Sequence, residues 1–310
     1  MASGKDTTFR AFNSQQGSNY AQARQDYHPR LYSAVIDHHR STGGQFDTLL
    51  DVGCGPGMAV RNLAPHFNHA IAIDPSAGMI ESALAIPSPP AKAAPIRFAV
   101  STAEVLGSDL SPPVAGASID LLTAATAAHW FDMPKFWARA AEVIKPGGTV
   151  AVWCAGGISV SPTTLNHERV QAAIDRLEDS IQDYIVTGNR IARSQYVDLL
   201  LPWTVEPPVL DFDKSAFVRK EWGHGEGLEP GEEFYNMNTA GLDMLEKIVG
   251  TSSPVIRWRE ANPEKVGTEE DLVKVMRREI EDAFADAGVE KGKEVLRAGA
   301  KGVLLLVKRR

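Results

Sequence analysis

The sequence predicts an α/β fold, a doubly wound parallel sheet with helices on both faces, and two observations support this expectation. A short apolar run at residues 48–52 leads directly into a glycine-rich turn, and the turn leads into a helical pattern at residues 58–66. Further apolar runs of strand length then alternate with helical patterns as far as Trp153. Near-continuous apolar strands are typical of parallel sheets that are covered on both faces.

The turn carries glycine at every second position, as Gly53, Gly55 and Gly57. Glycine lets the backbone bend tightly and approach a ligand, because no Cβ stands in the way. The spacing does not fit the G-x-G-x-x-G fingerprint of dinucleotide sites, since Met58 stands where the third glycine would fall. Asp51, just before the turn, would also repel a phosphate, so the pattern disfavours a NAD-dependent oxidoreductase. A carboxylate here suits a cationic ligand with an amino group and a sulfonium.

The D-x-G-x-G-x-G pattern of residues 51–57 resembles the first motif of class I S-adenosylmethionine (SAM)-dependent methyltransferases. The segment D-L-L-T-A-A-x-A-A-H-W-F-D at residues 120–132 strongly resembles the trans-aconitate-methyltransferase-like group, which includes fungal secondary-metabolite methyltransferases. The resemblance is good from about Tyr20 to Trp153 and loose beyond. It implies a seven-stranded Rossmann-like sheet, with SAM as cofactor and S-adenosylhomocysteine as product.

Cofactor-binding residues follow from the strand ends and from this resemblance. Asp74 ends the second strand, seventeen residues after Gly57, where an acidic side chain accepts hydrogen bonds from the ribose hydroxyls. Pro75 and Met79 open the next helix, and we expect Met79 to pack on the adenine.

The resemblance extends to the turn after the third strand, residues 96–100. It implies that the Ala103 backbone and the Thr102 side chain contact the adenine, although many relatives have Asp at the Thr102 position. Glu104 is expected to start a helix near the cofactor, where the helix dipole favours a carboxylate. Ala124, near the end of the fourth strand, belongs to a group of small residues that leave room for a ligand.

Residues 1–40 are expected to form an N-terminal lid. The pattern Y-x-x-x-R-x-x-Y-x-P at residues 20–29 resembles the segment that related enzymes fold over the cofactor. It implies that Tyr20 and Arg24 contact the methionine end of SAM. The alternative for Tyr20 is a place on the core face of its helix, and Tyr27 has the pattern of a core-filling residue.

The remaining organisation is a SAM-binding core at residues 41–154, a mostly helical substrate cap with the sixth strand at 155–235, and C-terminal helices with the last strand at 236–310. We expect helices at 168–186, 232–248 and 268–287, and an extended edge segment at 202–217. The apolar run at 302–307 suits the last, antiparallel strand of a methyltransferase sheet.

The catalytic candidates are His129, just past the fourth strand, and His224, in a glycine-flanked loop. A hydroxyl acceptor must lose a proton, and a neutral imidazole is suited to take it. A structural role is the alternative for either histidine. Trp130, Trp222 and Tyr235 are the candidate acceptor-binding residues, because an aromatic cap favours a large apolar acceptor. We therefore expect O-methylation of a hydroxyl or N-hydroxyl on a natural product.

Two other functions stay open at this point: carboxyl O-methylation of the trans-aconitate type, and SAM binding by a regulatory protein that has lost catalysis. The second would have its acceptor pocket filled. No metal is expected, because no predicted loop carries a carboxylate trio or a His/Cys cluster at ligand spacing.

The composition limits the kinds of binding partner that the chain can have. A net charge of −7 argues against a nucleic-acid surface. The longest apolar runs fall well short of a membrane span, and residues 1–10 lack the apolar stretch of a signal peptide. The two cysteines, Cys54 and Cys154, are expected to be buried fillers. A cytoplasmic enzyme with a small-molecule acceptor is therefore the expectation, and the oligomeric state stays unknown.

Overall fold

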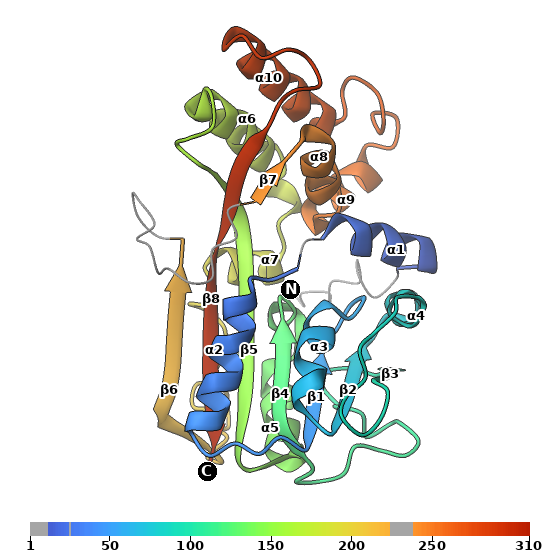
Figure 1. Ribbon diagram of the computed structural model, residues 1–310, viewed down its shortest axis with the longest axis vertical. Coiled ribbons are helices and arrows are strands. Elements are labelled where there is room, and N and C mark those ends of the chain that lie inside the picture. The colour runs from blue at the N-terminus through green and yellow to red at the C-terminus, as the bar shows by residue number, and fades with distance from the viewer. Residues whose placement is uncertain (1–11, 25, 224–237) are drawn as a thin grey trace.

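The computed structural model describes residues 12–24, 26–223 and 238–310, and one mixed sheet runs through its centre (Figure 1). Seven strands follow the order β3-β2-β1-β4-β5-β8-β6, and β7 pairs with β8 beside this path. The first five strands in this order are parallel, and β8 is antiparallel to both of its main neighbours. The strands are β1 (Thr48–Val52), β2 (His69–Asp74), β3 (Arg97–Val100), β4 (Ile119–Ala125), β5 (Ile144–Val160), β6 (Phe212–Trp222), β7 (Asn238–Ala240) and β8 (Leu296–Arg309). The expected doubly wound sheet with a late antiparallel strand is confirmed.

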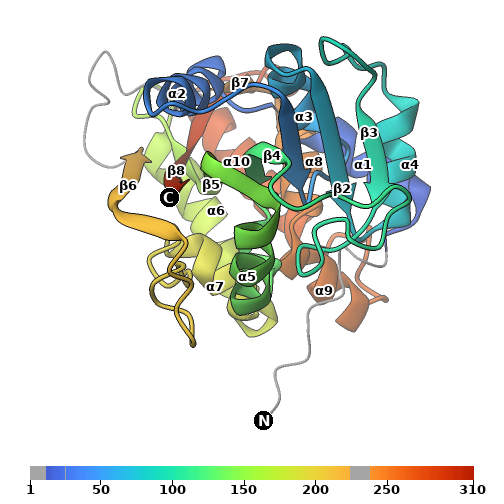
Figure 2. The same cartoon turned by 90° about the horizontal axis from the view of Figure 1, so that it is seen from below.

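Helices cover both faces of the sheet (Figure 2). On one face, α2 (Pro29–Ser41) and α3 (Met58–Leu63) pack on Leu49, Leu121 and Trp153. On the opposite face lie α5 (Met133–Val143) and α7 (Thr187–Arg193). Trp137 of α5 is fully buried there. The two apolar layers explain why the central strands have no polar face.

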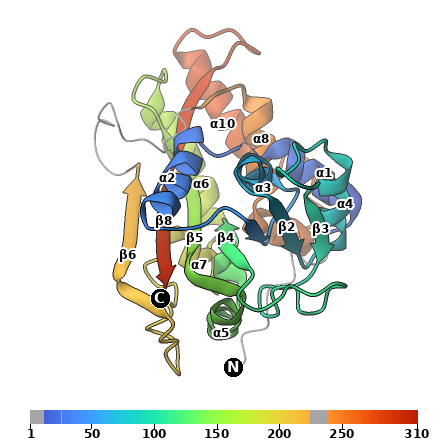
Figure 3. The same ribbon diagram turned by 60° about the horizontal axis from the view of Figure 1, so that its bottom comes forward.

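A helical cap stands above the core sheet, on the extended ends of β5 and β8 (Figures 1 and 3). Its main helices are α6 (His167–Ser180), α8 (Leu242–Gly250), α9 (Ser253–Ala261) and α10 (Leu272–Asp286). These helices share one apolar core with Val160 of β5 and Leu296 of β8. The cap therefore combines α6, from the expected insertion, with helices from the expected C-terminal segment.

The remaining short elements complete the first half of the chain and the cap. α1 (Ser14–Ala23) begins with a capping box in which Asn13 and Gln16 exchange hydrogen bonds. α4 (Ala77–Ala85) is capped by the Ser76 hydroxyl, which accepts from the Met79 N–H at 3.2 Å. The three 3₁₀ turns of the described chain are η1 (Ala64–His66), η2 (Ala128–Trp130) and η3 (Gln182–Tyr184).

Several expected boundaries were wrong. β5 is 17 residues long and continues into the cap, instead of ending near Trp153. β6 begins at Phe212, because residues 202–211 form turns around Pro207 and Pro208. Glu104 lies in a run of turns and starts no helix. The helix expected at 232–248 is described only as α8, since residues 224–237 lie outside the described part. No helix in the described residues is long and apolar enough to span a bilayer.

Candidate active site

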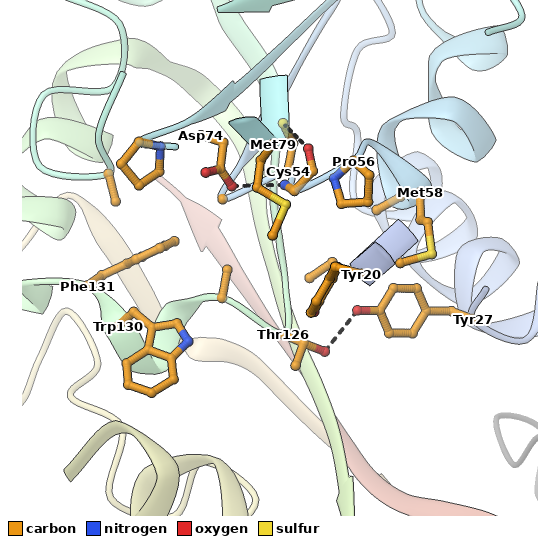
Figure 4. A pocket seen from close by; sticks show the side chains of 17 residues that line it. Tyr20, Tyr27, Cys54, Pro56, Met58, Asp74, Met79, Thr126, Trp130 and Phe131 are labelled. Atoms are coloured by element: carbon orange, nitrogen blue, oxygen red, sulfur yellow. Dashed lines mark hydrogen bonds between the residues drawn. The ribbon is translucent and has the colours of Figure 1, made fainter. Parts of the chain in front are cut away.

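The first cavity lies at the carboxyl ends of β1, β2 and β4 and encloses about 960 Å³, part of it open to solvent (Figure 4). The glycine turn after β1 forms its floor, and residues from α1, α4 and the segment after β4 form its sides. In a doubly wound sheet this edge is where ligands bind, because the strand order changes direction there. β1 has its neighbours β2 and β4 on either side, which makes this the reversal point.

The glycine turn needs glycine for two different reasons. At Gly53 a side chain would clash with a neighbour, and at Gly55 the missing side chain leaves open space. Gly53 has φ +66°, and a Cβ there would lie 2.6 Å from the Cβ of Ala127. Gly55 has φ +53°, and a Cβ there would meet no atom within 4 Å. Because Gly55 lines the cavity, its missing side chain leaves room for a ligand to reach the backbone. Cys54 lies between them, buried as expected, and its burial raises the pKa of the thiol well above the usual range.

Asp74 lies on the wall of the first cavity with its carboxylate held in place (Figure 4). Its Oδ2 accepts the Gly55 N–H at 2.9 Å, and its Oδ1 accepts the Ser76 N–H at 2.9 Å. These bonds connect the end of β2 to the glycine turn and to the start of α4. Pro75 and Met79 line the same wall.

Asp51 lies behind the turn and does not line the cavity. Its side chain is fully buried, and its Oδ1 accepts a hydrogen bond from the Thr123 hydroxyl at 2.6 Å. Burial raises the pKa of Asp51 to about 7, the Thr123 bond opposes the rise, and the charge of Asp74 adds to it. The structure thus does not bring this carboxylate into direct reach of a ligand in the first cavity.

Of the three residues expected around the adenine, Ala103 lines the first cavity, and Thr102 and Glu104 do not. Glu104 Oε1 instead accepts the Asp132 N–H at 3.2 Å, which connects this turn to the start of α5. Ala124 is fully buried within β4, and the next residue, Ala125, is on the wall. Strand alternation explains this difference, because neighbouring side chains point to opposite faces.

A second cavity of about 1180 Å³ adjoins the first, where β5 and β8 leave the core sheet below α8. Most of its wall is apolar, from residues such as Leu31, Ile158, Trp222, Leu245, Ile248 and Leu296. Its polar side is formed by Arg24, Asp26 and His28. Tyr20, Tyr27, Met58 and Thr126 line both cavities.

The lid segment supplies the polar side of the second cavity. The Arg24 guanidinium lies over the Tyr20 ring at 4.9 Å, and its Nε is buried with no hydrogen-bond partner within the described chain. His28 caps α2, where its Nδ1 accepts the Arg30 N–H at 3.1 Å. The neutral His28 ring therefore carries its proton on Nε2. Asp26 accepts from the Tyr32 hydroxyl at 2.6 Å and from Asn62 Nδ2 at 2.8 Å.

The candidate catalytic and acceptor-binding residues do not lie together in one cavity. His129 lines neither cavity, and its Nδ1 lies 3.0 Å from the buried Tyr196 hydroxyl. Trp130 lines the first cavity and Trp222 the second. His224 and Tyr235 lie outside the residues that the structure describes.

Sequence reasoning missed several wall residues, of which Thr126, Phe131, His28 and Tyr27 matter most for the site. Thr126 directly follows β4, and Phe131 follows η2 in the segment that leaves the same strand, so their place after a strand end was an available signal. His28 lies inside the lid pattern and gave no signal of its own. Tyr27 was interpreted from the sequence as a core-filling residue, whereas in the structure it lines both cavities.

Comparison with known proteins agrees with this geometry. The model of the methyltransferase domain family matches residues 50–152. The methyltransferase cfoB of Aspergillus candidus is 31% identical over 279 residues, which cover 83% of this chain and 84% of that protein. A Dictyostelium discoideum protein named as a methyltransferase is 30% identical over 58% of this chain, and the match spans 62% of its own length. A solved structure from Anaeromyxobacter dehalogenans, described as a type II methyltransferase, covers 92% of this chain and 96% of its own, with a TM-score of 0.58 and 22% identity.

The sheet order and the glycine turn at its reversal point are those of the class I methyltransferase fold, and the solved structure shares the overall fold. The chain belongs to the SAM-dependent methyltransferases, and SAM is its cofactor. The first cavity fits this group, because the open space at Gly55 admits a ligand and the Asp74 carboxylate lies on the wall, where each of its oxygens can accept more than one hydrogen bond.

Proposed function

We propose that the chain methylates an oxygen of a small apolar acceptor, with a hydroxyl or N-hydroxyl on a natural product as the first candidate. The observation that carries this proposal is the second cavity, which adjoins the cofactor site and is mostly apolar. When bound, SAM supplies a methyl group on a positively charged sulfur. The chain itself has to hold the two molecules in line and keep water away.

The first cavity is the proposed cofactor site. Asp74 accepts the ribose hydroxyls, and Met79, Ala103 and Phe131 surround the adenine. This placement is supported by the fact that all four residues line the first cavity. Tyr20 and Arg24 are assigned to the methionine end. Tyr20 lines both cavities, and Arg24 lines the second cavity, where its buried Nε has no partner within the described chain and a carboxylate at the junction would satisfy it.

The second cavity is the proposed acceptor site. Its apolar wall suits a large apolar molecule, and Trp222 contributes to it as expected for an acceptor-binding residue. A regulatory protein without catalysis would have this space filled, and the cavity of about 1180 Å³ favours an enzyme. Natural products of the kind made in fungal secondary metabolism match this chemistry, and the resemblance of residues 120–132 to fungal secondary-metabolite methyltransferases makes that class the first to test.

Of the two sequence candidates for the base of a hydroxyl acceptor, His224 is kept on the sequence alone, because it lies outside the described residues, and the position of His129 does not support that role. His129 lies outside both cavities and contacts the Tyr196 hydroxyl, which is an arrangement of a structural histidine. His28 does line the second cavity, but its Nδ1 lone pair is used by the cap of α2. It can donate through Nε2 and cannot accept a proton there.

A carboxylate acceptor is the second candidate, and the polar side of the second cavity favours it. The His28 Nε2–H is a donor on that side, and a donor is what an ionised carboxylate needs for orientation. A carboxylate is already deprotonated at neutral pH, so this reaction requires no base.

The test is methyl transfer to a panel of matched hydroxylated and carboxylated apolar molecules, followed by mass spectrometry. A pH–rate profile on the active acceptor then separates the two mechanisms. For a hydroxyl, we expect His224→Ala to lower turnover by about 10²–10⁴-fold with SAM affinity unchanged, and His129→Ala to act mainly on stability. For a carboxylate, neither variant changes turnover that much. Methylation of no panel member, with SAM bound, would contradict the proposal.

A further inference from the structure

The two cavities meet at a small set of shared wall residues, Tyr20, Tyr27, Met58 and Thr126. An in-line methyl transfer joins two molecules directly, so the methyl group has to cross where the two cavities meet. Under the proposed function, on which this inference rests, the shared residues therefore face the reacting atoms.

Two of these residues present hydroxyl oxygens that fix each other. The Tyr27 hydroxyl donates a hydrogen bond to Thr126 Oγ1 at 2.9 Å (Figure 4). The Tyr27 ring is held edge-on by Trp153, with ring centroids 5.6 Å apart, and by Tyr32 at 6.2 Å. Burial raises the pKa of Tyr27 above its usual range, so the phenol stays protonated. Its proton points to Thr126, and its oxygen lone pairs stay available.

The backbone of Thr126 is held in an unusual conformation. Its φ is +51°, in the left-handed region that a β-branched residue rarely adopts. The Thr126 N–H donates to the Trp153 carbonyl at 2.7 Å, which keeps the residue at the end of β4. Glycine or asparagine would adopt this φ more easily, and the presence of threonine places a hydroxyl at the junction. Strained residues of this kind gather at functional sites.

We propose that the Tyr27–Thr126 hydroxyl pair positions the transferable methyl group between donor and acceptor. A methyl group on a sulfonium carries partial positive charge, and hydroxyl oxygens are its preferred neighbours through C–H···O contacts. The product, S-adenosylhomocysteine, has neither the methyl group nor the charge. The pair therefore distinguishes SAM from its product before any acceptor is bound.

The test compares the dissociation constants of SAM and S-adenosylhomocysteine by calorimetric titration. Tyr27→Phe removes the hydroxyl and keeps the ring on Trp153. We expect it to weaken SAM binding by about two- to fivefold and to leave S-adenosylhomocysteine binding unchanged. Thr126→Val should have the same effect, and Thr126→Ser, which keeps the oxygen, should restore the wild-type ratio.

Tyr32→Phe is the matched control. The Tyr32 ring lies edge-on to the same Trp153 at 6.3 Å, and its hydroxyl bonds to Asp26, but it lines neither cavity. Its ratio of the two dissociation constants should equal that of the wild type. An unchanged ratio in folded Tyr27→Phe and Thr126→Val, with normal SAM affinity, overturns the positioning role and leaves the proposed function standing. Absence of SAM binding in the wild type would instead refute the proposed function.

Discussion

At the scale of single residues, Asp74 has the clearest assigned task. Its carboxylate is held by two backbone N–H groups, from the glycine turn and from the start of α4. A preorganised charged acceptor loses little entropy when a ligand hydroxyl binds to it.

Asp74→Ala should therefore weaken SAM binding by about 1–3 kcal/mol, because the ribose hydroxyls lose a charged acceptor. Calorimetric titration measures this change, and Asp37→Ala, which alters an exposed ion pair with Arg40, is the control. Thermal unfolding of Asp74→Ala checks that the turn itself remains folded. Equal SAM affinity in folded Asp74→Ala and wild type would mean that Asp74 does not hold the ribose.

His39 is buried, and its protonation changes the free energy of unfolding. Its Nε2 lies 2.7 Å from the Gln45 carbonyl and therefore carries the ring proton. Its Nδ1 accepts from the Thr149 hydroxyl at 2.8 Å, and Lys308 Nζ lies 3.1 Å from the same hydroxyl. Burial, opposed by the bond to Gln45 and assisted by the charge of Lys308, lowers the pKa of His39 to about 4.

The unfolded chain binds a proton at His39 below pH ~6.5, and the folded chain does so only near pH 4. The stability that His39 contributes is therefore present above pH ~6.5 and is lost as the pH falls toward 4. We expect a decrease of about 2 kcal/mol in the free energy of unfolding between pH 7 and pH 5. Urea titrations at both pH values measure it, and His39→Gln should have a flatter dependence. The same slope in both proteins would assign the effect to other groups.

The site residues predicted from the sequence fall into two groups, those that line the first cavity and those that do not, and the difference has a physical cause. Asp74, Pro75, Met79 and Ala103 all line the first cavity, because the carboxyl ends of parallel strands meet at one edge whatever the packing. Asp51 and His129 do not line it, because the face that each side chain uses depends on neighbours far away in the chain. Thr123 contacts Asp51 from β4, and Tyr196 contacts His129 from the segment after α7. No local pattern contains those partners.

At the scale of elements, the β5–β8 pair connects core and cap and forms part of the second cavity. Its register shifts between Gly156 and Ser159, where the strands leave the core sheet. Gly302 of β8 lies against Trp222 of β6, and a Cβ on Gly302 would stand 2.1 Å from Cζ2 of Trp222. The indole therefore occupies the space that a side chain at position 302 would need.

Gly302→Ala should lower the free energy of unfolding by about 1–3 kcal/mol, because Trp222 has to move within a packed core. Gly156→Ala is the matched control on the paired strand, since a Cβ there would meet no atom within 4 Å. It should be neutral or stabilising by less than about 1 kcal/mol. Chemical unfolding followed by tryptophan fluorescence measures both. Equal effects of the two substitutions would contradict the packing argument.

Element lengths were the weakest part of the sequence prediction. The apolar core of β5 was found, but its extension to Val160 passes through Gly156 and Gly157, which have low strand preference. The extension is stabilised by pairing with β8, which lies about 140 residues further along the chain. Pairing with β8 here outweighs the low strand preference of the two glycines, and the apolar pattern of the sequence does not indicate this pairing.

At the scale of the whole molecule, we predict that methyl transfer needs no metal ion. Within residues 12–24, 26–223 and 238–310, no group of three or more His, Cys, Asp or Glu side chains is arranged to hold an ion. We expect full methyl transfer after exhaustive chelation, because in-line displacement from a sulfonium relies on alignment and exclusion of water. Activity measured with and without EDTA tests this. Loss of activity that magnesium restores would overturn it.

The position of β8 between β5 and β6 has a consequence for synthesis on the ribosome. Both neighbours precede β8 in the chain, so they leave the ribosome long before the strand that joins them. Until residues 296–309 emerge, the long apolar edge of β5 has no partner on that side, and such an edge readily pairs with other chains. We therefore expect this edge to stay exposed while the entire cap is synthesised, and the second cavity, whose wall includes Leu296 and Ala298 of β8, to form only after β8 is inserted.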